Sequence, residues 1–195
     1  MSDPKIYKLE TTLVYLDLFR QVLVYSDTPL EKFHAVIQAT MGWFNRHLHQ
    51  FETSDGQTIT NSGFINGAFD AQDELDGENM TIESVLKRQD EWMLYTYDME
   101  DNRDHEIVLQ EILPVNEAQT YPQCIGGANA CPIEDSGGLQ GYEDLLETLS
   151  DPNNPEYEEI SCWILRVTGV PTYDPRHFDK NDANRRLANL SLYEQ

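Results

Sequence analysis

The chain has 195 residues, of which 39% are hydrophobic, and this is enough for one domain with a sizeable core. Its 35 acidic and 13 basic residues give a formal net charge of −22. Because affinity for DNA rests largely on lysine and arginine neutralising phosphates, this balance argues against a nucleic-acid partner. We interpret the acidity as favouring solubility, and the functional alternative is a basic partner or a cation.

The sequence also bears on where the protein is kept. No apolar run is long enough to cross a bilayer, and the first residues, MSDPKIYKLE, lack the charged-then-apolar pattern of a secretory signal. We therefore expect a cytoplasmic protein with no membrane partner. The three cysteines are an odd number, which favours reduced thiols over a disulfide framework and leaves metal binding as the alternative.

Strands are predicted mainly in the first two-thirds of the chain. Alternating apolar residues predict a half-buried strand at 6–18, and a second strand at 19–25 is close enough to pair with it. The residues expected on the inner face of the first strand are Tyr7, Leu9, Leu13 and Tyr15. A third strand is predicted at 47–53. The strands predicted at 91–98 and 105–113 form a hairpin through the acidic turn MEDNRD.

Helices are predicted from capping signals and apolar spacing. Thr28 and Glu31 can form a capping box around Pro29, and Gly42 ends the helix that follows. The inner face of this helix is expected to hold Leu30, Phe33, Val36, Ile37 and Met41. A short helix is predicted at 81–87. The inward residues of three later helices are Tyr142, Leu145, Leu146 and Leu149, then Tyr157, Ile160, Trp163, Ile164 and Val167, and finally Ala183, Leu187 and Leu190 after an Asp179 cap.

This order of elements favours an α+β fold, with an antiparallel or mixed sheet packed by several helices and a mainly helical C-terminal third. Residues 54–79 are polar and contain glycine, so we expect a long loop or a short hairpin there. The chain shows no internal repeat, low-complexity tract or linker. We therefore predict a single domain over residues 1–195.

The segment GWFNRHLHQF contains His47 and His49, two residues apart. If the segment is a strand, both imidazoles lie on the same face of the sheet. One rigid element would then present two nitrogens to a divalent metal such as zinc. The alternative is that both rings form hydrogen bonds at a sheet edge.

A second group of metal-ligating residues lies in YDMEDNRDHEIVL, which holds Asp98, Asp101 and His105. The spacing resembles the opening of a calcium loop, but Arg103 stands where that motif needs glycine and Leu109 where it needs glutamate. The functional interpretation is a carboxylate–histidine cluster on the same sheet as the His-x-His pair. The alternative is a solvated hairpin turn.

The most irregular stretch is PQCIGGANACPIEDSGGLQGYED, residues 122–144. Cys124 and Cys131 are separated by more residues than the close pairs of structural zinc sites, so they are weak metal candidates. Glu134 and Asp135 could act as a general base or oxygen ligands, or could instead bond backbone N–H groups of the loop. No phosphate-binding motif is present. We hypothesise that the stretch is a structured lid held against the histidine-bearing sheet.

The blocks HLHQF, YTYDMEDNRDHEIVLQEILP and YPQCIGGANACPIEDSGGLQGYEDLLE together resemble the plasmid pRiA4b ORF-3-like family over residues 5–190. Some members are labelled as passengers of insertion elements or as resolvase-like. The resemblance implies one compact α+β domain and brings no established activity. The family pattern covers Trp43, His47, His49, Phe51, Tyr97, Asp98, Asp101, His105, Cys124, Gly126, Gly127, Pro132, Glu134, Asp135, Gly137, Gly138, Gly141 and Tyr142.

Three positions depart from that family pattern. Glu100 stands where members commonly have glycine, and Arg103 where they commonly have tryptophan. Ser136 replaces a further cysteine of many members, which weakens any thiol-based metal site.

Three functions remain open. The leading hypothesis is an accessory or binding protein, linked to mobile elements by resemblance, that acts through contacts with a protein or a small ligand. The alternative is a metal-dependent, hydrolase-like enzyme with a metal on His47, His49 and His105 and on Asp98 or Asp101, and with Glu134 as the base. A DNA-binding mobile-element protein is the least favoured, because the composition can hardly build a basic surface.

Overall fold

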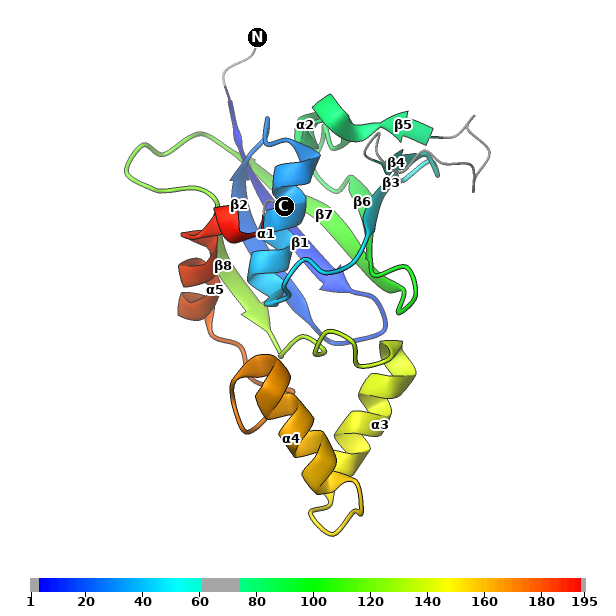
Figure 1. The fold of residues 1–195 in the computed structure, drawn as a ribbon. Coiled ribbons are helices and arrows are strands. Elements are labelled where there is room, and N and C mark those ends of the chain that lie inside the picture. The colour runs from blue at the N-terminus through cyan, green and yellow to red at the C-terminus, as the bar shows by residue number, and fades with distance from the viewer. Residues whose placement is uncertain (1–3, 61–73, 194–195) are drawn as a thin grey trace.

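The computed structural model describes residues 4–60 and 74–193, and within them eight strands form one sheet (Figure 1). The strands are β1 Ile6–Leu13, β2 Phe19–Tyr25, β3 His49–Thr53, β4 Thr58–Thr60, β5 Glu74–Asp76, β6 Trp92–Tyr97, β7 Arg103–Leu113 and β8 Gln123–Ala128. Their order across the sheet is β5-β4-β3-β6-β7-β1-β2-β8. All neighbours are antiparallel except β4 and β5, which are parallel. The sheet is therefore mixed, and the predicted α+β fold is confirmed.

The helices are α1 Leu30–Met41, α2 Ile82–Val85, α3 Gly138–Ser150, α4 Tyr157–Thr168 and α5 Lys180–Leu187, with short 3-10 turns at Gly77–Asn79 and Leu190–Leu192. Helix α1 lies across one face of the sheet, and its predicted inner residues are all buried. Burial alternates along β1, as expected for a strand with one face covered and one face toward solvent. The core therefore lies between α1 and the sheet.

Two local predictions near the N-terminus are wrong. The first strand ends at Leu13, whose N–H donates to the Leu18 carbonyl and closes the turn to β2. Tyr15 lies in that turn with φ 71° and is 83% exposed, so it is not on the inner face. The Thr28 capping box is also absent from α1. Instead, the Leu30 N–H donates to the Met80 carbonyl, because a bridge between Pro29 and Thr81 brings that segment to the helix end.

The predicted loop 54–79 contains more strand than expected. Residues 61–73 of that prediction lie outside the described part of the chain. On either side of them, β4 pairs with β3 as a short hairpin and β5 extends the sheet beyond β4. The β3–β4 hairpin takes one of its strands from outside the predicted range, and β4 and β5 are parallel, so these two strands do not form the predicted short hairpin with each other.

Strand β8 is the largest element missing from the sequence predictions. It occupies the first part of the stretch 122–144 and pairs antiparallel with β2 at the sheet edge. A side chain at Gly127 would lie 2.8 Å from the Phe19 carbonyl and from the ring of Phe178, so glycine permits this close packing. The stretch is thus part edge strand and part loop, and the hypothesis of a single lid over all of it is wrong.

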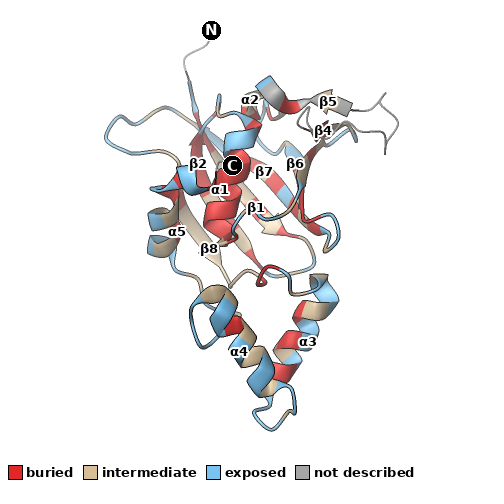
Figure 2. Cartoon of the chain, in the orientation of Figure 1, coloured by how far each residue is buried: buried red, intermediate tan, exposed pale blue. Residues whose placement is uncertain are grey.

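The last three helices are arranged in two ways. Helix α5 packs against α1 and β8, and its N-cap residue Asp179 accepts hydrogen bonds from the N–H groups of Asn181 and Asp182, as predicted. Helices α3 and α4 instead project away from the sheet as a hairpin (Figure 1). Figure 2 shows the contrast in burial between this hairpin and the sheet. The buried residues of α3 are Tyr142, Leu145 and Thr148, and in α4 only Ile164 is buried.

Candidate functional site

The site begins where α1 ends. Gly42 has φ 90°, a conformation that suits glycine, and its N–H donates to the Gln38 carbonyl. The chain then turns so that Trp43 is buried, with its ring stacked on Tyr97 at 5.2 Å between centroids. The indole N–H of Trp43 donates to the Pro132 carbonyl at 2.9 Å. Trp43 therefore joins α1, β6 and the loop 130–136.

Glu134 fixes the same loop through two hydrogen bonds. Its side chain is buried, and one oxygen accepts a hydrogen bond from the Tyr97 hydroxyl at 2.6 Å while the other accepts the Phe44 N–H at 2.9 Å. Burial, together with the adjacent Glu134 carboxylate, raises the pKa of Tyr97, so this phenol stays protonated. Each carboxylate oxygen already has a protein donor. The buried Glu134 side chain therefore ties the loop to Tyr97 and to the backbone of Phe44.

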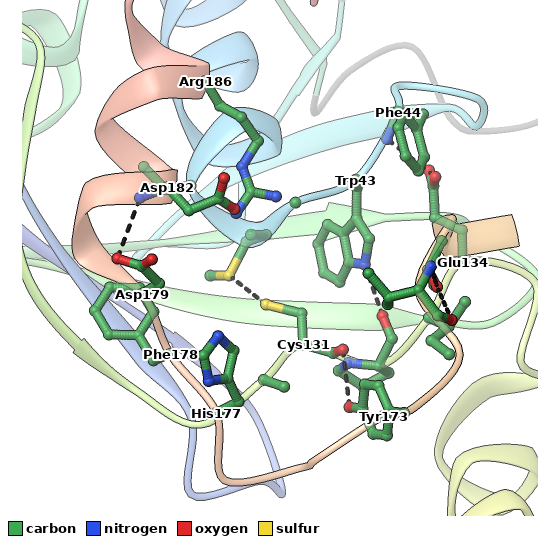
Figure 3. A pocket seen from close by; sticks show the side chains of 18 of the residues that line it. Trp43, Phe44, Cys131, Glu134, Tyr173, His177, Phe178, Asp179, Asp182 and Arg186 are labelled. Carbon is green, nitrogen blue, oxygen red and sulfur yellow. Dashed lines mark hydrogen bonds and ion pairs between the residues drawn. The ribbon is translucent and has the colours of Figure 1, made fainter. Parts of the chain in front are cut away.

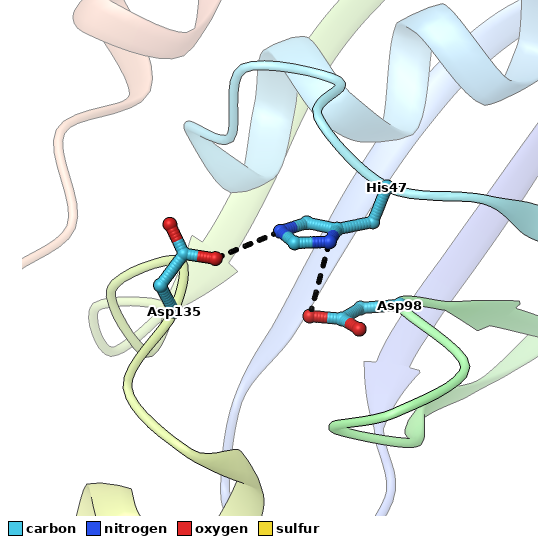
Figure 4. Close-up of side chains that lie close together, drawn as sticks. All are labelled: His47, Asp98 and Asp135. Carbon is cyan, nitrogen blue, oxygen red and sulfur yellow. Dashed lines mark hydrogen bonds and ion pairs between the residues drawn. The ribbon is translucent and has the colours of Figure 1, made fainter.

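His47 lies between two aspartates, one from each neighbouring loop (Figure 4). Its Nε2 is 2.9 Å from Oδ1 of Asp135, and its Nδ1 is 3.6 Å from Oδ2 of Asp98. One ligand atom from each of the three residues lies within 4.8 Å of the others. Among the described residues, this is the one group of three or more histidine, cysteine or acidic side chains close enough to hold a metal ion.

The backbone explains how the two aspartates reach His47. Asp98 follows β6 with φ 61°, and its Oδ1 accepts the N–H groups of Glu100 and Asp101 at 3.3 Å, which leaves Oδ2 toward the ring. Asp135 also has a positive φ, 61°, so it turns outward immediately after the buried Glu134. Adjacent acidic residues thus have opposite environments.

His49 does not join His47. Strand β3 begins at His49, so His47 lies before the strand and the two rings have different partners. His49 stacks on His34, with ring centroids 3.5 Å apart and nearly parallel planes. Burial, with the neighbouring His34 ring, lowers the pKa of His49 to about 3. The predicted common face for the His-x-His pair is therefore wrong.

His34 itself belongs to a buried hydrogen-bond network. Its Nδ1 is 2.7 Å from the Tyr95 hydroxyl, which accepts a bond from Gln38, and its Nε2 is 2.7 Å from Oδ1 of Asn45. Since Asn45 Oδ1 can only accept, the ring carries its proton on Nε2 and accepts from Tyr95 on Nδ1. Burial lowers the pKa of His34, in agreement with a neutral ring.

His105 is fully buried in β7 and is also separate from the His47 group. Its Nδ1–H donates to the Tyr95 carbonyl at 3.2 Å, and its ring lies edge-on to Trp43. Burial lowers the pKa of His105 to about 3. The three-histidine metal centre expected from the sequence is therefore not formed, because His105 is fully buried and His49 is stacked on His34, with its Nε2 3.8 Å from Glu31 Oε2.

Asp101 is engaged by Arg103 rather than by His47. The buried Arg103 guanidinium donates from one nitrogen to Asp101 Oδ2 at 2.8 Å, to the Ile133 carbonyl at 3.1 Å and to Ser136 Oγ at 3.3 Å. Partial burial alone would raise the pKa of Asp101, but hydrogen bonds from Gly138 and Arg103 outweigh it and hold the pKa below its ordinary value. Arg103 thus ties the hairpin turn to the loop 130–136. Its departure from the family pattern was the one signal for this role.

The two cysteine candidates lie apart from the aspartates. Cys124 is buried in β8, with its thiol directed to the Gly126 carbonyl at 3.5 Å. Cys131 lies 3.3 Å from the sulfur of Met41 and 3.3 Å from an Arg20 nitrogen. Burial raises the pKa of both thiols, which disfavours the thiolate form that binds metals. The structure gives no support to a thiol-based metal site in the described residues.

A cavity of about 350 Å³ lies beside Trp43, between the end of α1, the loop 130–134 and the segment that joins α4 to α5 (Figure 3). Its aromatic wall comprises Trp43, Phe44, Tyr173 and Phe178, and its charged or polar wall includes His177, Asp179, Asp182 and Arg186. Sequence reasoning missed the C-terminal half of this lining. The signal was weak, because YDPRHFD reads only as a turn before a helix.

Gly42 leaves room for Arg186 at the cavity wall. A side chain at Gly42 would come within 2.5 Å of the Arg186 guanidinium, so glycine leaves the space that the arginine occupies. Arg186 pairs with Asp182 on the same helix, and its Nε has no hydrogen-bond partner in the described residues.

The fold and these contacts define an α+β protein in which one loop, residues 130–136, is bonded to Trp43, Tyr97 and Arg103. A family model for plasmid pRiA4b ORF-3-like proteins matches residues 5–182, and the chain belongs to this family. No helix among the described residues has the length and apolar character needed to cross a membrane.

Two relatives match nearly the whole chain. The uncharacterised protein y4hQ of Sinorhizobium fredii is 27% identical over 189 residues, which cover 95% of this chain and 92% of the relative. The crystal structure of protein MM3350 of unknown function from Methanosarcina mazei Go1 has a TM-score of 0.78 and 29% identity, and covers 93% of this chain and 98% of its own.

Proposed function

We propose that the protein is a binding protein that holds a small, partly aromatic molecule in the cavity beside Trp43. The observation that carries this proposal is the cavity volume of about 350 Å³, with aromatic side chains on one wall and charged ones on the other. Ligand pockets commonly have this size, an apolar lining and a few polar groups that orient the ligand.

The lining suggests which molecules fit. An aromatic ring could pack against Tyr173 and Phe178, which are only partly buried, while a polar end would meet Arg186 and His177. The Tyr173 hydroxyl is already bonded to the Cys131 carbonyl and to Tyr142, so this side of the wall is fixed before a ligand enters. A fixed wall lowers the entropy lost on binding.

The test is a thermal-shift screen with a library of small aromatic acids and amines. Val170 lines the cavity and is 51% exposed, so Val170→Trp should fill the entrance without disturbing the core. Leu165→Trp is the matched control, because Leu165 is 48% exposed on α4 and does not line the cavity. We expect compounds that raise the Tm of the wild type and of Leu165→Trp but not of Val170→Trp. An equal rise in all three proteins would place binding elsewhere.

A divalent cation at His47, Asp98 and Asp135 is the second candidate function. One observation favours it, namely three ligand atoms within 4.8 Å, and zinc accepts this combination of one imidazole and two carboxylates. However, the carboxylates face opposite nitrogens of the ring, so one of them must move for all three to reach one ion. Because Glu134 is buried and ties the loop to Tyr97 and Phe44, we assign the activation of a water molecule to the metal.

Elemental analysis of protein purified without chelator tests this candidate. Bound zinc or manganese in the wild type and in His177→Ala, but not in His47→Ala, would support a site at His47. His177 is an exposed histidine outside the cluster and controls for surface binding. Equal metal content in all three proteins would reject the site.

A further inference from the structure

A second concave surface lies between α3 and α4 and is separate from the cavity beside Trp43. The groove measures about 420 Å³, and none of its lining residues lines that cavity. In Figure 1 the two helices meet at their connection and diverge toward the sheet, so the groove runs along the hairpin and reaches residues 135–136. The groove is thus built by two helices that have few buried residues.

The floor of the groove is apolar and only partly covered. Leu145 of α3 and Ile160 and Trp163 of α4 line it. Of the five α4 residues that the sequence predicted to face inward, only Ile164 is buried, while Tyr157, Ile160, Trp163 and Val167 keep intermediate exposure. An amphipathic helix normally covers such a stripe against a neighbouring element. Here α3 covers the apolar stripe of α4 only in part, and the rest of the stripe stays accessible to a partner.

The rim of the groove is strongly acidic. Asp144, Glu156 and Glu159 line it together with one basic residue, Arg166, and residues 138–168 contain seven acidic residues against that single arginine. None of the seven carboxylates forms an ion pair within the described residues. Moreover, the sequence has no lysine or arginine between Arg103 and Arg166. Arg166 offsets only part of this charge, so the groove keeps a negative field.

We propose that this groove receives a basic, amphipathic helix of a partner protein. The apolar floor would take its apolar face, and the acidic rim would pair with lysine or arginine on either side, as in other helix-in-groove complexes. Helices α3 and α4 are 13 and 12 residues long, so a partner helix of similar length could contact the whole groove. A second copy of this chain does not fit, because its net charge of −22 opposes self-association.

The test uses a fluorescein-labelled model peptide of about 18 residues with leucine on one face and lysine on the other, titrated at low and high salt. The matched peptide has serine in place of leucine and the same charge. We expect the leucine peptide to bind the full-length protein at micromolar concentration, and the serine peptide to bind at least tenfold more weakly.

Two pairs of variants locate the binding. Glu156→Gln with Glu159→Gln removes two charges from the rim, and Glu106→Gln with Glu117→Gln removes two exposed charges elsewhere. Only the rim pair of substitutions should weaken binding of the leucine peptide, by about fivefold, because each exposed ion pair contributes little binding free energy. Equal weakening by both pairs, equal binding of both peptides, or no binding by the wild type would overturn the proposal. This test is independent of the cavity and its ligand.

Discussion

The sheet with α1 and the α3–α4 hairpin are stabilised in different ways. The sheet and α1 share one buried cluster, and polar groups within it, such as Arg103 and Glu134, are bonded to neighbouring loops. The hairpin has few buried residues, and its acidic side chains form no ion pair in the described chain. The two regions have similarly amphipathic sequences. The burial of a helix therefore depends on the surface it packs against. Helix α1 packs against the sheet, whereas α3 and α4 pack mainly against each other.

Replacing Trp43 with alanine should have the largest effect, because Trp43 connects three segments of the sheet region. Loss of a buried tryptophan and its bond to Pro132 should lower the free energy of unfolding by about 3–5 kcal/mol. Urea unfolding followed by circular dichroism measures this. Trp92→Ala is the control, since Trp92 is 41% exposed and should cost less than about 1 kcal/mol. Similar losses for both variants would contradict a structural role for the Trp43 contacts.

Replacing Ile164 with alanine should affect the hairpin alone. Ile164 is the one buried residue of α4, and its truncation should cost about 2–3 kcal/mol, which is enough to open a small local unit. Hydrogen exchange with mass spectrometry should then show faster exchange in residues 138–168 and unchanged exchange in β1, β6 and β7. Leu165→Ala, at an exposed position, is the control. Faster exchange in the central strands would mean that the hairpin and the sheet unfold as one unit.

The sequence was sufficient for elements with strong local patterns. The predictions of β2 and α1 agree closely with the structure, because a short run of β-prone apolar residues and a 3.6-residue apolar period are both local signals. Strand β8 has no such pattern, since its glycines allow close packing against the C-terminal segment and its pairing depends on the free edge of β2. That information is not local to the strand.

The candidate site was predictable only in part, for a related reason. His47 and His49 differ in environment because β3 begins at His49 and leaves His47 outside the strand. The strand was predicted to begin at residue 47, and an error of two residues is usual for a boundary predicted from sequence. The side chains of Glu134 and Asp135 point to different environments because Asp135 has a positive φ. Such single-residue choices depend on tertiary contacts with Tyr97, Phe44 and His47, and the sequence pattern does not contain them.

The smallest expected effect is the pH dependence of stability that His49 contributes. It belongs to the sheet region, because the hairpin, residues 138–168, contains no histidine. Burial holds the pKa of His49 at about 3, below its ordinary value of 6.5, so the folded protein keeps this ring neutral while the unfolded chain takes up a proton. The stability contributed by the neutral ring is therefore complete above pH 6.5 and declines as the pH falls toward 3. At pH 5.5 the loss should be about 1.4 kcal/mol for this residue.

The variant His49→Phe removes the titrating group and keeps an aromatic ring against His34. The difference in the free energy of unfolding between pH 7.5 and pH 5.5 should become smaller by about 1.4 kcal/mol than in the wild type. Leu48→Phe, at the exposed neighbouring position, should leave that difference unchanged. If His49→Phe also leaves it unchanged, then His49 binds its proton equally in the folded and unfolded states. In that case, water would reach the stacked rings of His34 and His49 as readily as it reaches the hairpin.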